Sequence, residues 1–236
     1  MLQIKNLTKS YSNGKKAVDN LTINVNPGEI YGFIGHNGAG KSTAIKCVVG
    51  ALKFQEGEIY INGKSIVSSP FLAKMQFAYI PDNPDVYEHL TGIQYLNFVA
   101  DIYRVSKEDR NANIEKFSSL FEIKSNLGDL ISSYSHGMRQ KLVLISALIH
   151  SPKLLILDEP FVGLDPIASH NLKEIMLELC KNGCSVFFST HVLEVAEKLC
   201  HRIGIIKEGK LVAEGEVNKL VGDKSLESIF LEMANA

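Results

Sequence analysis

The chain has 236 residues, enough for one large domain or a domain with a subdomain, and its 45% hydrophobic and 22% charged residues are typical of a globular protein. A formal net charge of −1 removes any global argument for nucleic acid or anionic lipid as a partner. Met1–Ser10 has no apolar core, so we expect no secretory signal. Apolar runs such as Leu154–Leu157 are too short to cross a bilayer. We therefore expect any link to a membrane to run through another chain.

The first third of the chain predicts strands. Apolar and polar residues alternate there, which is typical of half-buried strands, and Pro27-Gly28 and Asn62-Gly63 are strong turn signals. The predicted strands include Leu2 and Ile4, Leu21–Val25, Ile30–Ile34 and Gly57–Asn62.

From about Leu90 to His150 the apolar residues take helical spacing instead. Apolar runs without alternation then return, as expected of parallel strands buried on both faces, with helical segments between them. These runs are Leu154–Leu157, Ser185–Thr190 and Ile203–Ile206, followed by a hairpin tip at Lys207–Lys210 and a helical tail from Ser225. The order implies an α/β fold in which a helical block is inserted into a parallel-sheet core.

Four cysteines could suggest a metal site, since His201 adjoins the last of them. No CxxC or HxxxH pair occurs, however, and such pairs are usual in zinc sites. We interpret them as buried free thiols in a reducing cytoplasm. They are Cys47, Cys180, Cys184 and Cys200.

Residues Gly35–Ser42 match the pattern GxxxxGK[ST], between the apolar run Ile30–Ile34 and a helical segment that Gly50 would end. Glycines let successive N–H groups converge on phosphate oxygens, and the following helix adds its positive end. Lys41 would bridge the β- and γ-phosphates, and the Ser42 hydroxyl would bind Mg²⁺. The alternative is a glycine-rich turn without a ligand. The predicted nucleotide-binding segment is Gly35, His36, Asn37, Gly38, Ala39, Gly40, Lys41, Ser42 and Thr43.

The buried strand Leu154–Leu157 ends in two adjacent carboxylates, Asp158 and Glu159. Ligands bind where parallel strands end, and neighbouring residues there point in different directions. Asp158 would hold Mg²⁺, through its water shell, and Glu159 would polarise the attacking water. Acidic residues also cap helices, and Asp165-Pro166 has the form of such a helix start.

His191 follows the strand Ser185–Thr190 at the same sheet edge, and we assign it to sensing the γ-phosphate, although single histidines are more often structural. Tyr11 precedes the strand Leu21–Val25. It is a candidate platform for stacking the adenine ring, with an ordinary surface position as the alternative.

A segment upstream of Asp158 reads Tyr134-Ser135-His136-Gly137-Met138-Arg139-Gln140-Lys141. It resembles the LSGGQ signature of ABC ATPases, with Ser135 and Gly137 retained. Together with Gly163-Leu164-Asp165, similar to a D-loop, and His191, similar to an H-loop, the resemblance covers nearly the whole chain. The variant signature and the closing Ser225–Leu231 are similar to ATPases of bacterial ABC-2, multidrug and bacteriocin-resistance exporters.

The resemblance implies a P-loop NTPase (RecA-like) fold with an antiparallel β subdomain and an inserted α-helical subdomain. It implies one ABC ATPase domain over 1–236, divided into 1–85 (β subdomain and first part of the core), 86–150 (helical subdomain), 151–215 (rest of the core) and 216–236 (helical tail).

The resemblance also implies a function: ATP hydrolysis with Mg²⁺ in a head-to-tail dimer, with a second copy or a related subunit. Lys41, Glu159 and His191 would be catalytic. Ser135 and the backbone at His136 and Gly137 would contact the γ-phosphate bound by the other subunit, and Asp165 would also bind nucleotide. The helical subdomain would dock on a polytopic transmembrane permease. The chain would then be cytoplasmic, at the inner face of the cell membrane, and no nucleic acid is expected.

Three positions depart from the family pattern: Met138 replaces glutamine, His136 replaces glycine, and Asp82 stands where a Q-loop glutamine is expected. Asp82 would reach Mg²⁺ directly, through water, or serve only the coupling loop. The apolar and aromatic residues after it are either core or an exposed contact for the membrane subunit. They are Val86, Tyr87, Leu90 and Tyr95.

Two other functions account for less of the sequence. ABC ATPases that act on ribosomes usually carry two cassettes and repair types carry long inserts, and this chain has neither, nor a basic stripe. A small-molecule kinase with the same phosphate loop would leave Tyr134–Lys141 unexplained. An exporter subunit accounts for all of these motifs.

Overall fold

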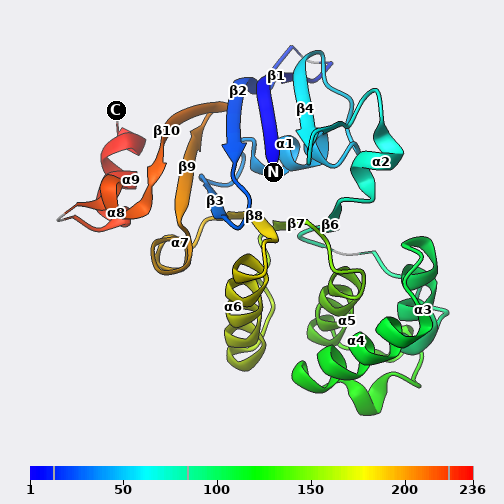
Figure 1. The fold of residues 1–236 in the computed structure, drawn as a ribbon. Coiled ribbons are helices and arrows are strands. Elements are labelled where there is room, and N and C mark those ends of the chain that lie inside the picture. The colour runs from blue at the N-terminus through cyan, green and yellow to red at the C-terminus, as the bar shows by residue number, and fades with distance from the viewer. Residues whose placement is uncertain (13, 84, 223, 236) are drawn as a thin grey trace.

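The computed structural model describes residues 1–12, 14–83, 85–222 and 224–235. Its centre is a six-stranded sheet with the order β10-β9-β3-β8-β7-β6 (Figure 1). The parallel strands are β3 (Ile30–Ile34), β8 (Ser185–Thr190), β7 (Leu154–Asp158), β6 (Phe77–Ile80) and β9 (Arg202–Lys207), and β10 (Lys210–Glu216) pairs with β9 in the antiparallel sense.

The central strands are buried on both faces, which explains their uninterrupted apolar sequences. In β3, Ile30 and Ile34 enter one hydrophobic core and Tyr31 and Phe33 enter the other. The two-residue period of a strand sends neighbours to opposite faces, so each central strand joins both cores. This burial fixes the register of the sheet and with it the position of the strand ends that form the site.

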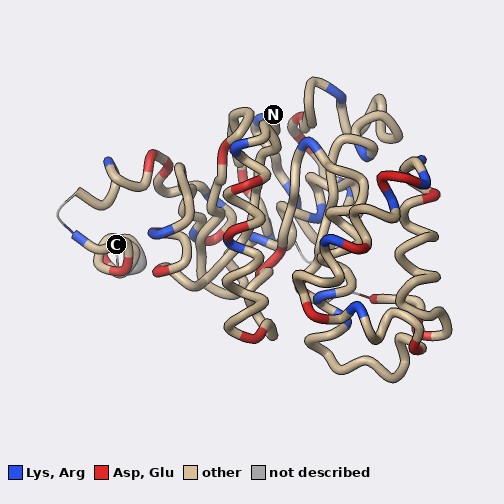
Figure 2. Tube along the Cα trace, turned by 60° about the horizontal axis from the view of Figure 1, so that its bottom comes forward, with Lys and Arg blue, Asp and Glu red and all other residues tan. Residues whose placement is uncertain are grey.

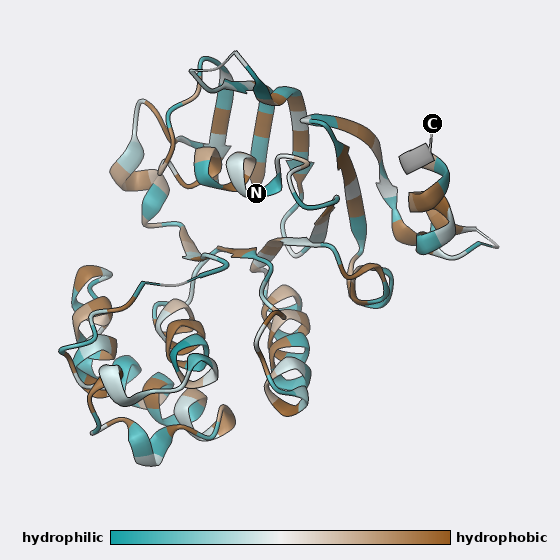
Figure 3. Cartoon of the chain, turned by 180° about the vertical axis from the view of Figure 1, so that it is seen from behind, coloured by the Kyte–Doolittle hydropathy of each residue, from teal (hydrophilic) through white to brown (hydrophobic). Residues whose placement is uncertain are grey.

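A second, antiparallel sheet has the order β2-β1-β4-β5 and packs against one face of the first. Its strands show alternating hydrophobic and hydrophilic bands in Figure 3, as expected for a sheet with one face in water. The helix α1 (Lys41–Val48) lies in the core between the two sheets. The strands are β1 (Leu2–Ser10), β2 (Lys16–Val25), β4 (Glu56–Ile61) and β5 (Lys64–Ser65).

The helices α3 (Gly92–Ile102), α4 (Lys107–Leu120) and α5 (His136–Leu148) form a block on the other side of the central sheet (Figure 1). Short 3₁₀ turns, η1 (Lys124–Asn126) and η2 (Ile131–Ser133), connect α4 to α5. A capping box at Thr91 and Gln94 starts α3, and the Ser135 hydroxyl caps α5.

The last third alternates helices with the strands β7, β8 and β9. The helix α6 (Pro166–Lys181) connects β7 to β8, and α7 (Leu193–Leu199) connects β8 to β9. After β10 the chain forms α8 (Val217–Val221) and α9 (Leu226–Asn235), which pack at the β9–β10 edge (Figure 1).

The structure confirms the predicted α/β fold, the parallel central strands, the helical stretch and the hairpin tip at Lys207–Lys210. The sequence analysis did not predict the edge strand β6 or the short helix α2 (Pro70–Lys74). The helix of the signature-like segment begins at His136.

The distribution of charged residues and the state of the cysteines agree with the expectations from the sequence. Basic and acidic residues are interspersed along the trace in Figure 2, so the net charge of −1 reflects local mixing of both signs. All four cysteines are free and buried, and burial raises the pKa of the Cys47 and Cys184 thiols to about 11. No helix in the described ranges is both long and apolar enough to cross a bilayer.

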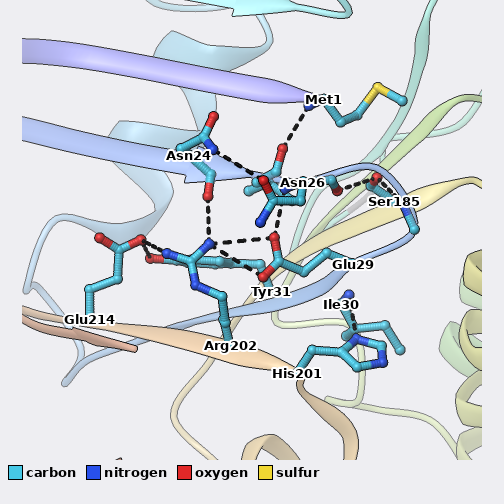
Figure 4. A network of polar contacts seen from close by, with 12 residues as sticks. Met1, Asn24, Asn26, Glu29, Ile30, Tyr31, Ser185, His201, Arg202 and Glu214 are labelled. Atoms are coloured by element: carbon cyan, nitrogen blue, oxygen red, sulfur yellow. Dashed lines mark hydrogen bonds and ion pairs between the residues drawn. The ribbon is translucent and has the colours of Figure 1, made fainter. Parts of the chain in front are cut away.

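A polar network joins the amino ends of the central strands to the β1–β2 sheet (Figure 4). The Glu29 side chain is 8% exposed and lies 3.3 Å from Nη1 of Arg202. Arg202 also donates to the Asn24 carbonyl (2.8 Å) and pairs with Glu214 (2.7 Å), to which the Tyr31 hydroxyl donates. Arg202 is thus the cation that offsets the desolvation of the buried Glu29 carboxylate.

Replacing Arg202 with Met is therefore expected to lower the free energy of unfolding by about 2 kcal/mol, because a buried carboxylate loses its cation. Urea unfolding would measure this loss. The exposed pair Lys198–Glu194 offers the control Lys198→Met, for which we expect a change below about 0.5 kcal/mol. Equal losses in the two variants would contradict the role given to Arg202.

Candidate nucleotide site

The phosphate-loop segment Gly35–Ser42 lies between β3 and α1, as predicted. Gly38 and Gly40 have positive φ values of 81° and 111°, a conformation that side chains disfavour. A Cβ on Gly35 would lie 2.6 Å from the Ile206 carbonyl oxygen, and a Cβ on Gly38 would meet nothing within 4 Å. The loop is thus tight where it passes β9 and open on its outer side.

Lys41 is 5% exposed, and its ammonium lies inside the loop. It donates to the Gly35 carbonyl at 2.7 Å and to the His36 carbonyl at 3.3 Å. It also forms an ion pair with Oε1 of Glu159 at 3.2 Å. The positive charge therefore lies at the N-terminus of α1, where the helix dipole also favours an anion.

The loop opens into a cavity of about 620 Å³, the size of many small-molecule sites. Its walls come from the β1–β2 turn, the phosphate loop, the start of α1, the end of β6 and the β9–β10 turn. The lining includes most of the phosphate loop with Ser42 and Thr43, and also Tyr11, Asp82 and Glu159.

The two carboxylates at the end of β7 lie in different surroundings. Asp158 is 2% exposed and accepts a hydrogen bond from the Ser189 hydroxyl at 2.6 Å. Glu159 has φ 50°, in the left-handed region, and its side chain lines the cavity. The Ser189 oxygen also accepts from the Glu159 N–H at 3.0 Å, which fixes the two residues relative to each other.

His191 lies beside Glu159, at the end of the neighbouring strand β8. Its Nδ1 lies 2.9 Å from Oε2 of Glu159, and its backbone N–H donates to the same oxygen at 3.3 Å. The His191 side chain is 48% exposed, so it is open to solvent at this sheet edge. Lys41, Glu159 and His191 thus form one chain of contacts across three strand ends.

Tyr11 and Asp82 lie at the rim of the cavity. The Tyr11 side chain is 46% exposed, and its hydroxyl lies 3.3 Å from the Thr43 hydroxyl. Asp82 follows β6, and both Asp82 and Asp158 contribute to the raised pKa of Tyr79, about 12, whose main cause is burial. The two carboxylates therefore lie close enough to act on the same phenol.

Ser135, Gly137 and Asp165 do not line this cavity. The Ser135 hydroxyl accepts from the Met138 N–H at 3.2 Å and caps α5. Asp165 caps α6 through the Ala168 N–H (2.8 Å) and pairs with Lys141 (2.8 Å), whose hydrogen bond holds the pKa of Asp165 below its usual value. A Cβ on Gly137 would lie 3.7 Å from the Gly163 carbonyl, so the two segments lie side by side.

Three residues of the site were not predicted from the sequence. Ser189 donates to the Asp158 carboxylate and accepts from the Glu159 backbone N–H, but it lies within an apolar strand, where a serine gives no signal. Lys16, at the start of β2, and Glu208, in the β9–β10 turn, line the cavity beside the phosphate loop. The motif at Lys207–Lys210 was recognised only as a hairpin tip.

The arrangement suits a polyphosphate with a bound cation. Successive loop N–H groups and Lys41 offer positive charge to phosphates, and Ser42 and Asp82 line the cavity with oxygens of the type that Mg²⁺ prefers, while Asp158 is buried behind the lining. Glu159, with Lys41 on one oxygen and His191 on the other, has the geometry of an oriented base.

Comparison with known proteins agrees with this site. Residues 18–162 match the ABC transporter family. The chain is 36% identical to the ABC-type transporter ATP-binding protein EcsA of Bacillus subtilis, over 99% of this chain and 96% of that one. It is 37% identical to the bacitracin transport ATP-binding protein BcrA of Bacillus licheniformis, over 91% and 69% of the two chains.

Solved structures give the same result. A structure of an ATP-binding subunit of an ABC transporter superposes with a TM-score of 0.95 at 34% identity, covering 99% of both chains. A dimeric ATP-binding cassette in a post-hydrolysis state with ADP and Pi superposes with a TM-score of 0.82 at 24% identity, covering 92% and 99%. The predicted P-loop NTPase fold is confirmed, and the chain belongs to the ABC transporter family as an ATP-binding subunit that hydrolyses ATP.

Proposed function

We propose that this chain supplies the ATP-driven step of an exporter, as a Mg²⁺-dependent ATPase attached to a separate transmembrane subunit. The contact chain from Lys41 through Glu159 to His191, in which Lys41 and Glu159 line the cavity at the phosphate loop, carries this proposal. Export is inferred from similarity to a bacitracin transport ATPase and from the variant signature at Ser135–Lys141.

In this proposal each side chain has a defined task. The loop amides and Lys41 bind the β- and γ-phosphates, and Tyr11 stacks on the adenine at the open rim. Ser42, Asp158 and Asp82 would hold Mg²⁺, which would neutralise charge on the phosphate oxygens. Glu159 orients and polarises the attacking water, and His191 keeps the Glu159 carboxylate in position and faces the γ-phosphate.

We further propose a head-to-tail dimer. Ser135, Gly137 and Asp165 lie together through the contact between their segments, but away from the cavity of their own chain. The N-terminus of α5 at Ser135 is a second anion-binding end that needs a ligand from outside the chain. A second copy turned by a twofold axis would place it over the nucleotide, and the dimeric cassette noted above supports such pairing.

Ser135→Ala is expected to lower hydrolysis by about 10-fold or more, because the γ-phosphate loses a donor from the opposite subunit. Since Ser135 also caps α5, Ser135→Thr is the matched variant that retains both a cap and a hydroxyl, and we expect it to keep most activity. ATPase assays over a range of protein concentrations would show whether activity requires a dimer. Full activity of Ser135→Ala, or of a monomer, would contradict the proposal.

The transmembrane partner would contact the helical subdomain. Tyr87, Phe98 and Ile102 are 51%, 43% and 53% exposed, and the rings of Tyr87 and Phe98 contact edge to face at 5.6 Å. Of the four residues left open in the sequence, Tyr87 is exposed, and Val86, Leu90 and Tyr95 are half-buried against the core. We retain the division into 1–85, 86–150, 151–215 and 216–236 as part of this proposal.

Purification of the tagged chain from detergent-solubilised membranes tests the proposed function. We expect a polytopic membrane protein to copurify, and its presence to change the ATPase rate. The variant Tyr87→Ser removes the exposed ring. We expect it to reduce copurification of the membrane protein without loss of basal ATP hydrolysis. Recovery of the chain only with ribosomes or nucleic acid would overturn the proposal.

A further inference from the structure

The C-terminal helix α9 packs directly against the phosphate loop. The Phe230 ring lies 4.6 Å from the His36 ring, centroid to centroid, at an angle of 57°. Phe230 is 8% exposed, although His36 is at the exposed outer side of the loop. The C-terminal helix thus contacts the residue that follows the first glycine of the motif.

The helix α9 is itself anchored to both neighbours of the loop. Its first N–H, at Leu226, donates to Glu197 of α7 at 2.8 Å, and Lys207 of β9 donates to the Met233 carbonyl at 3.1 Å. Leu226 and Phe230 also belong to the main hydrophobic core. A helix fixed at two points can hold a ring against the loop with little freedom to move.

The backbone of His36 is part of the phosphate-binding geometry. Its carbonyl accepts from the Lys41 ammonium at 3.3 Å and from the Ala39 N–H at 3.1 Å. Glycines on both sides leave this stretch few conformational restraints of its own. A side-chain contact at His36 is therefore a means of keeping the loop in its binding shape before the nucleotide arrives.

We propose that Phe230 is a positioning residue for ATP binding, acting through the His36 ring on the phosphate loop. This inference rests on the proposed nucleotide site. An aromatic pair of this kind changes an equilibrium constant by about 2- to 10-fold. Because the contact is with the phosphate loop, we expect the change in ATP affinity, while the chemical step depends on Glu159.

The test is a double-mutant cycle with Phe230→Ala, His36→Ala and the pair, reading kcat, KM and the Kd for ATP. Phe230→Ala is expected to raise KM and Kd by about 3- to 10-fold, with kcat within about 2-fold of the unmodified protein. Phe230→Tyr, which keeps the ring, should restore the affinity. In the His36→Ala background, Phe230→Ala should add less than about 1.5-fold.

Glu232, exposed on the same helix and paired with Lys224, gives the control Glu232→Ala, for which no change in KM is expected. A lower Tm for Phe230→Ala with an unchanged Kd would assign the residue to packing alone and overturn the inference. Effects that multiply in the double variant would overturn it as well. If the unmodified protein neither bound nor hydrolysed ATP, the proposed function itself would fail, so the two failures are distinguishable.

Discussion

Glu159→Gln is expected to lower the rate of ATP hydrolysis by at least about 100-fold and to leave ATP binding nearly intact. The carboxylate lies 3.2 Å from Lys41 and 2.9 Å from His191, and its loss removes the acceptor for the proton of the attacking water. Glutamine has the same length and shape and tolerates the positive φ of this position equally well. The fold and the phosphate loop should therefore be unchanged.

Hydrolysis would be measured as phosphate release, and binding by titration with ATP. Glu174→Gln is the matched control, since Glu174 is exposed on α6 and carries the same charge change away from the cavity. We expect its rate to stay within about 2-fold of the unmodified protein. Hydrolysis by Glu159→Gln within about 3-fold of normal would exclude Glu159 as the base and leave the water without an oriented acceptor in this cavity.

The parts of the fold that the sequence predicted are those set by local patterns. Ile30–Ile34 and Leu154–Leu157 are unbroken apolar runs, and only burial on both faces accommodates such runs in strands. Gly38 and Gly40 occupy backbone conformations that glycine favours, so the residue types alone predict the loop. The cap at Asp165 followed by Pro166 is equally local.

The parts that were missed depend on tertiary contacts. Phe77–Ile80 is a four-residue apolar run before a proline, and it becomes a strand only by pairing with β7. Ser189 matters because β8 places its hydroxyl beside Asp158, which no periodicity reveals. Phe230 has ordinary helical spacing in the sequence. Its partner His36 lies in the phosphate loop, far from it in the sequence, so no local pattern reveals the contact.

Lys41→Met is expected to weaken ATP binding by at least about 100-fold, because the phosphates lose charge-assisted hydrogen bonds from a buried ammonium. Methionine matches the length of the lysine stem and suits a side chain that is 5% exposed. The change removes the donor to the Gly35 and His36 carbonyls, so the empty loop should also become less rigid.

Lys46→Met is the matched control, because Lys46 is exposed on the same helix and points away from the core. Titration with ATP and with ADP separates two sources of affinity. Lys41 bridges to the γ-phosphate, so the loss should be larger for ATP than for ADP, while the loop N–H groups and the helix dipole act on both nucleotides. Equal losses would mean that Lys41 acts on the β-phosphate alone. An ATP affinity within about 3-fold of normal would mean that backbone donors suffice, and the buried charge would then serve the Glu159 carboxylate in place of the nucleotide.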